Sequence, residues 1–148
     1  MLKITLPDGA QREFAAPLTG LELAMEISRS LAKKAVALRV DGEVKDLSTL
    51  LERDASVAIL SADDPAALEI LRHDCAHVMA EAVKELFPET QITIGPVIEN
   101  GFFYDFARPT PFSLDDLHAI EQRMREIVDR DEPISREVWE RDKAVAFF

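Results

Sequence analysis

The sequence has very few residues of several types, and each shortage excludes a class of structure or function. A single cysteine, Cys75, allows no internal disulfide and is typical of a reducing compartment. No apolar run approaches the length that spans a bilayer, and residues 1–5 begin no signal peptide. We therefore expect a cytoplasmic protein without a membrane partner.

Positive charge is also scarce. The chain of 148 residues carries 17 Lys and Arg against 28 Asp and Glu, which gives a net charge of -11. Nonspecific binding to nucleic acid needs a basic footprint, so this charge argues against it, although other parts of a longer protein could still hold an RNA. The 47% of hydrophobic residues is enough for a packed core and excludes a disordered chain.

The first sixty residues predict a compact unit rich in β-structure. Thr19 and Glu22 have the spacing of a capping box, and the helix they begin continues through Leu23, Ile27 and Leu31. Strands are expected at 2–6, 11–14, 35–40, from Val44, and at 56–60, with a hairpin turn at Asp41-Gly42 and a short turn or helix at 47–51. The order ββαββ, with a late strand at the sheet edge, fits a ubiquitin-like β-grasp unit.

The rest of the chain predicts a second unit that contains both helices and strands. Asp64 and Pro65 suit the start of a helix that stops at Pro88. Its core-facing stripe is expected to be Leu71, Cys75, Val78, Ala82 and Leu86. Strands are expected at 91–98, with a Gly-Pro interruption, and at 102–106, with a turn at 99–101 between them. A helix is expected from Ser113, with an apolar face made of Leu117, Ile120, Met124, Ile127 and Val128. A strand at 134–139 and a helix at 142–148 are expected to follow. The end at Phe147-Phe148 resembles a cut through a larger domain.

Two histidines on the long helix are the first candidates for chemistry. His73 and His77 lie four residues apart, so a helix projects both imidazoles from one face. This spacing is half of a common metal-binding layout, but the zinc-protease form needs a glutamate where Asp74 stands. A lone pair of helical histidines is more often structural or exposed than catalytic. Cys75 lies about 200° around the helix from His73 and is expected in the core.

The stretch from Ile94 to Phe106 is the second candidate. It could be a β-hairpin with a packed aromatic face, or it could form a pocket wall against the histidine helix. In the second interpretation Tyr104 and Asp105 offer a hydroxyl and a carboxylate to a polar ligand. His118, the third histidine, is expected to face solvent.

Together these residues resemble the threonyl-tRNA synthetase family. Residues 1–9 and 27–36 are similar to its N-terminal TGS domain, a β-grasp unit, and His73-x-x-x-His77 and 94–106 are similar to the start of its editing domain. The resemblance implies an α+β chain with a TGS domain at 1–62 and an incomplete α+β editing domain at 63–148. The full family enzyme attaches threonine to its tRNA with ATP and removes serine attached in error.

The resemblance assigns roles to four residues. His73 and His77 would form half of the hydrolytic site, without a certain metal, and Tyr104 and Asp105 would hold the seryl group or the terminal adenosine. The second editing motif, Cys-x-x-x-His, is absent, so the chain alone should edit little. It should need no cofactor. ATP, Mg and a catalytic-core Zn are implied for the full enzyme only, with tRNA(Thr) and seryl-tRNA(Thr) as partners and a homodimer as its assembly.

Two other interpretations remain open from the residues. The first is a noncatalytic module that binds RNA or a regulator through the β-grasp unit, with structural histidines. The second is a freestanding metal-dependent hydrolase that uses His73 and His77.

Overall fold

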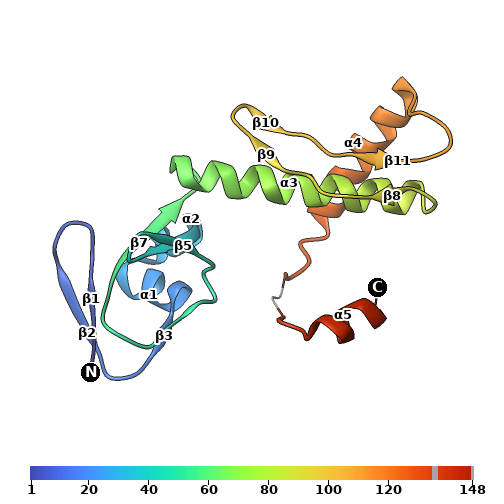
Figure 1. Ribbon diagram of the computed structural model, residues 1–148. Coiled ribbons are helices and arrows are strands. Elements are labelled where there is room, and N and C mark those ends of the chain that lie inside the picture. Colours follow the sequence, from blue (N-terminus) through green and yellow to red (C-terminus); the bar gives the residue numbers. More distant parts are fainter. Residues whose placement is uncertain (135–136, 148) are drawn as a thin grey trace. The chain divides into compact units, whose positions relative to one another are not determined.

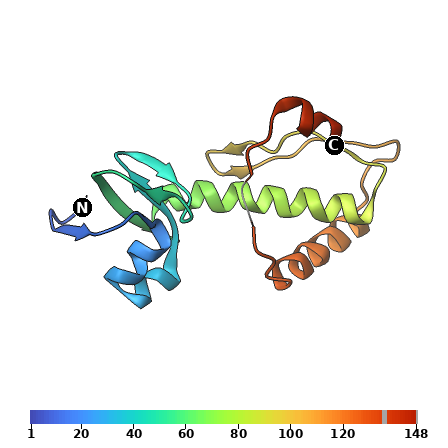
Figure 2. The ribbon, with the colours of Figure 1, turned by 90° about the horizontal axis from the view of Figure 1, so that it is seen from below.

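The computed structural model describes residues 1–134 and 137–147 (Figure 1; Figure 2 shows the ribbon turned by 90°). The chain divides into two units. The first comprises 1–76 and 95–104, and the second comprises 77–94 and 105–148. Both units contain helices and strands, and the expected α+β class with a β-grasp unit is confirmed. None of the helices in the described part of the chain is long and apolar enough to cross a membrane.

A five-stranded mixed sheet forms the base of the first unit. Its strand order is β2-β1-β7-β4-β5. The strands are β1 (Leu2–Thr5), β2 (Gln11–Phe14), β4 (Ala35–Val40), β5 (Glu43–Lys45) and β7 (Ala55–Ser61). The Asp41-Gly42 turn joins β4 to β5, and both of its residues have the positive φ that such a turn requires (50° and 92°).

One expectation for this unit is wrong, and another is only partly correct. The last strand, β7, is not at the edge but in the centre, where it pairs in parallel with β1 and antiparallel with β4. In the segment 47–51 the expected turn is present at 47–48, but Leu50–Leu51 form a short strand, β6, paired with β3 (Leu18–Thr19). Both pairings join residues far apart in the sequence, so local patterns do not reveal them.

Helices α1 (Gly20–Ile27) and α2 (Arg29–Lys34) lie beside this sheet (Figure 1). The capping box is present as expected, since Thr19 and Glu22 bond reciprocally. The single helix expected through Leu31 is interrupted at Ser28, whose extended backbone ends α1 and whose side chain caps α2. Serine is a good N-cap, and this local signal outweighs the apolar spacing across it.

The core of the first unit lies between α1 and the strands. Its buried residues are Leu2, Ile4, Leu18, Leu23, Leu38, Leu51 and Val57. Gly20 is also buried, and a Cβ placed there would come within 2.2 Å of the Leu38 side chain. The first turn of α1 can therefore approach β4 only because this position has no side chain.

The long helix α3 (Pro65–Leu86) begins in the first unit and continues into the second. Asp64 caps it as expected, accepting a hydrogen bond from the Ala66 amide at 2.9 Å. The expected core stripe is only partly correct, because Leu71 is 41% exposed and Cys75 is exposed. Small side chains are buried instead, and the buried residues of α3 are Ala67, Ala76, Ala80, Ala82 and Val83.

The strands after α3 are shorter than expected. In the first unit, β9 (Val97–Ile98) and β10 (Gly101–Phe102) form the expected hairpin. In the second unit, β8 (Gln91–Ile92) pairs with β11 (Phe106–Ala107), so the strand expected at 102–106 is broken in its middle.

Helix α4 (Leu114–Asp129) provides the core of the second unit together with α3. Ser113 caps it in a capping box with Asp116. Ile120 and Ile127 are buried against Ala82 and Val83, whereas Leu117 and Val128, also expected inside, are mostly exposed. Helix α5 (Arg141–Phe147) follows. The strand expected at 134–139 includes residues 135 and 136, which lie outside the described residues, and its described positions, Ile134 and 137–139, are not in a strand.

An ion-pair cluster also joins α3 to α4. Glu85 accepts two hydrogen bonds from Arg130, at 2.7 and 2.9 Å, and one from Arg123 at 2.7 Å. These hydrogen bonds, from Arg130 foremost, lower the pKa of the Glu85 carboxyl from 4.5 to about 2. The cluster therefore holds a carboxylate ionised in acid where a free glutamate is protonated.

Candidate functional site

Helix α3 carries both candidate histidines on its exposed side. His73 and His77 are exposed and lie one turn apart, with His73 in the first unit and His77 in the second. Asp74 and Cys75, between them, are exposed as well. The helix is unbroken over this stretch, so its backbone projects both side chains from one face.

A hollow of about 320 Å³ in the first unit includes His73. It is lined by Val44 of β5, by Ala66, Glu69, Ile70 and His73 of α3, and by Val97 of β9. Two of its residues can carry charge, and Glu69 precedes His73 by one helical turn. Glu69 was not among the residues singled out from the sequence, although its spacing of four from His73 was a usable signal.

Arg72 connects α3 to the β9–β10 hairpin. Its Nη1 donates to the carbonyl oxygens of Glu99, at 2.8 Å, and Ile98, at 3.4 Å. Ile98 provides the last carbonyl of β9 and Glu99 the first carbonyl of the turn. Because the guanidinium of Arg72 is charged, its hydrogen bonds are stronger than those of a neutral donor. Sequence reasoning missed this contact, because nothing in the spacing of 72 and 99 indicates that they meet.

Tyr104 lies in the first unit, half-buried against Gly95. A Cβ placed on Gly95 would be 2.2 Å from Cδ2 and 2.6 Å from Cε2 of the tyrosine ring. Real Cβ atoms essentially never come that close, so the ring occupies the space that any other residue at 95 would fill. Gly95 thus fixes where the only tyrosine of the chain lies.

Asp105 belongs to the second unit and is exposed. Its backbone carbonyl accepts a hydrogen bond from the Thr93 hydroxyl at 2.9 Å, which ties the segments before β9 and after β10. His118 is exposed on α4, as expected.

The donor set for a metal is incomplete. Residues 1–134 and 137–147 contain no group of three or more His, Cys, Asp and Glu side chains that could hold a metal ion. Protein zinc sites use three or four such ligands, so His73 and His77 supply too few by themselves.

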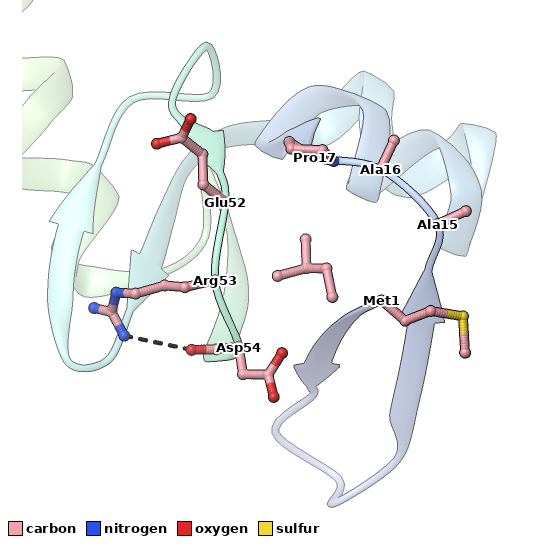
Figure 3. A pocket seen from close by; sticks show the side chains of 8 residues that line it. Met1, Ala15, Ala16, Pro17, Glu52, Arg53 and Asp54 are labelled. Atoms are coloured by element: carbon pink, nitrogen blue, oxygen red, sulfur yellow. Dashed lines mark hydrogen bonds between the residues drawn. The ribbon is translucent and has the colours of Figure 1, made fainter.

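Another hollow, of about 180 Å³, lies in the first unit (Figure 3). Its charged side chains are Glu52, Arg53 and Asp54, and Arg53 pairs with Asp41 at 3.0 Å, so it offers no comparable chemistry.

The residues around α3 suit proton transfer better than metal chemistry. Imidazole is the side chain most often used as a general acid or base, and here two of them are exposed on one helix. A carboxylate at Glu69 can orient or stabilise the charge of the neighbouring His73. Described residues offer no activated nucleophile beside them, because Cys75 lies on another part of the helix surface.

Comparison with known proteins gives two findings. Residues 2–61 match the family model of the TGS domain. The chain is 64% identical over 148 residues to threonine–tRNA ligase of Parvibaculum lavamentivorans, 64% over 149 residues to that of Paramagnetospirillum magneticum, and 60% over 148 residues to that of Rhodospirillum rubrum. Each match covers the whole of this chain but only 23% of the relative, so the chain spans about a quarter of their length.

Proposed function

We propose that this chain, which carries a TGS domain at 2–61 and is similar along its whole length to threonine–tRNA ligases, is the N-terminal region of such an enzyme. The whole enzyme joins threonine to tRNA(Thr) with ATP, and this region contributes to the hydrolysis of seryl-tRNA(Thr). We assign 1–62 to the TGS domain and 63–148 to the first part of an editing domain. The strongest support is that the identity extends over all 148 residues, well beyond the TGS domain.

A second, hydrolytic site has a physical reason in this enzyme class. Serine differs from threonine by one methyl group, and a binding pocket gains only about 1–3 kcal/mol from such a group. Hydrolysis of the wrong ester supplies the remaining discrimination. The reaction adds water to the ester carbonyl, so it needs a base for the water proton and a donor for the developing oxyanion.

His73 and His77 are the residues that we assign to these two tasks. Both are exposed, and they extend from the same face of one unbroken helix, one turn apart. One imidazole takes the proton of the attacking water, and the other donates to the carbonyl oxygen. As the bond between the acyl carbon and the ribose oxygen breaks, the imidazolium returns its proton to that oxygen, which releases serine and the free 3′ end of the tRNA. Glu69, beside His73 in the same hollow, stabilises the imidazolium that forms.

Tyr104 and Asp105 are assigned to substrate binding. The Tyr104 ring is held in place by Gly95 and offers a hydroxyl and an aromatic face, which suit a ribose or an adenine. The exposed Asp105 carboxylate suits the ammonium group of the seryl ester. Arg72 supports this assembly by holding the hairpin that leads to Tyr104.

Other parts of the enzyme supply the remaining functions. We assign ATP, Mg and Zn binding to other regions of the enzyme, since this chain spans only about a quarter of the length of its relatives. A second editing motif, Cys-x-x-x-His, and the contacts of a homodimer are likewise expected there. The 148 residues alone should therefore hydrolyse seryl-tRNA(Thr) weakly or not at all.

The test compares the two activities in the full-length enzyme. His73→Ala and His77→Ala should each slow seryl-tRNA(Thr) hydrolysis by about 10²-fold or more, the usual contribution of a general acid or base, while threonine attachment is kept. His118→Ala removes an exposed histidine from α4 and serves as the matched control, with both activities unchanged. Equal loss of both activities in the two α3 variants would indicate a folding role instead.

A further inference from the structure

The positive charge of this acidic chain is concentrated around α2. The segment 27–40 contains four cationic residues and no acid, and it is the longest acid-free stretch of the sequence. Arg39 in this segment pairs with Asp64 at 3.7 Å. Arg29, Lys33 and Lys34 have no ion pair within the described part of the chain, so their charges remain available to a partner.

Two of these cations border an apolar hollow of about 310 Å³ between α1 and α2. Its lining residues are Leu21, Met25, Arg29, Ala32 and Lys33. Leu21 is 37% exposed and Met25 is 53% exposed, although both are apolar. The hollow exists because Ser28 interrupts the helix, so that α2 does not continue along the line of α1 and brings Ala32 and Lys33 beside Leu21 and Met25.

The acidic residues of α1 do not line this hollow. The Glu22 carboxylate accepts hydrogen bonds from both the amide and the hydroxyl of Thr19. Glu26 does not line the hollow, and its backbone carbonyl accepts a hydrogen bond from Arg12 at 3.2 Å. The surface thus combines an apolar floor with a cationic border, on a molecule whose net charge is -11.

We infer that the α1–α2 surface, made of these five lining residues, binds an acidic amphipathic helix of a partner protein. Helices of this kind place apolar anchors at i, i+3 or i+4 and i+7 into an apolar groove, and their flanking carboxylates meet cations at its border. The exposed methionine suits this role, because its flexible thioether adapts to varied apolar partners. This inference is independent of the proposed hydrolytic role of α3.

The same surface does not suit a single-stranded RNA. Proteins bind unstacked bases chiefly on aromatic side chains, and no aromatic residue lines the hollow, where the Arg29 guanidinium is the single planar group. The net charge of the chain also opposes a polyanion, whereas a short peptide carries few charges. Charge complementarity together with the apolar floor therefore favours an acidic peptide.

The test uses the 148-residue chain and fluorescein-labelled peptides of about four helical turns. The main probe carries leucine at i, i+4 and i+7 with glutamate beside each leucine. A second peptide has the same composition with the leucines scattered, a third has lysine in place of glutamate, and a single-stranded RNA is the fourth probe. Binding is measured by fluorescence anisotropy, and its location by amide chemical shifts of the ¹⁵N-labelled chain.

We expect the acidic amphipathic peptide alone to bind, with shifts concentrated at 21–33 and affinity that falls as salt rises. Met25→Glu and Lys33→Glu should each weaken binding by about tenfold, a modest effect for a groove anchor or a border charge. Lys33→Glu should also improve binding of the lysine peptide. Lys3→Glu, which changes the charge equally on an exposed residue of β1, should have no comparable effect.

Several results would overturn the inference. They are the absence of binding by the acidic peptide, equal binding of the scattered peptide, shifts outside 21–33, or tighter binding of the RNA than of the peptide. Circular dichroism of each variant checks that the fold is kept, and both substituted side chains are exposed, so the chain should tolerate the changes.

Discussion

Replacement of Gly95 by alanine should displace the ring of Tyr104. The new Cβ would lie 2.2 Å from Cδ2, whereas ordinary contact begins at 3.4 Å, so the ring must retreat by about 1.2 Å. Gly95 is not among the glycines with positive φ, and alanine therefore meets no backbone penalty there. The overpacking should lower the free energy of unfolding by about 1–3 kcal/mol.

A double-mutant cycle isolates this contact. In a Tyr104→Ala background the space beside residue 95 is empty, so Gly95→Ala should cost nothing or stabilise the chain by about 0.4–1 kcal/mol through the lower entropy of the unfolded state. Urea unfolding followed by circular dichroism gives the four free energies, and the NMR signals of the Tyr104 ring report its displacement. Additive effects of the two substitutions, or unchanged ring signals in Gly95→Ala, would refute the proposed packing.

Three further predictions test other contacts. Glu85 has a pKa of about 2 in the folded chain, below its ordinary 4.5, so its carboxylate stabilises the fold above pH 4.5 and this contribution disappears as the pH falls towards 2. The stability difference between the wild type and Glu85→Gln should therefore shrink over that range, and a difference that is constant with pH would contradict the ion-pair cluster. Arg72→Gln should loosen the β9–β10 hairpin, with faster amide hydrogen exchange at 97–102 and unchanged exchange in β4; exchange that is equal to the wild type would show that Arg72 does not hold the hairpin. Thr19→Ala should lower the free energy of unfolding by about 0.5–2 kcal/mol, as the loss of a helix cap does, and Thr19→Ser should restore most of it.

Signals within a few residues predicted most of the elements correctly. The pair Thr19 with Glu22 predicted one helix start and Ser113 predicted another, and both starts are capped in the structure. Asp41-Gly42 likewise predicted its hairpin. These devices work because the side chain and the backbone group that it satisfies are close in sequence.

Features that depend on distant residues were not predictable. The exposed and buried faces of α3 are the clearest case. Alanines and larger apolar residues occur on several sides of this helix, so its sequence is compatible with more than one core-facing stripe. Ala76 and Ala80 are buried and Leu71 is exposed because of the segments that pack against α3, and these segments are distant in the sequence. The contacts of Gly95 with Tyr104 and of Arg72 with Glu99 also join separate elements, so the sequence does not reveal them.

The central position of β7 has a consequence for how the first unit folds. Strand β1 is synthesised first, but the edge of β1 that faces away from β2 pairs with residues 55 and 56, about fifty positions later in the chain. The β1–β2 hairpin therefore cannot gain its core until nearly the whole unit is available, and such non-local closure slows folding. We expect the sheet to assemble in a single late step as β7 inserts, and a chain cut before residue 55 to leave both β1 and β4 as open edges prone to association.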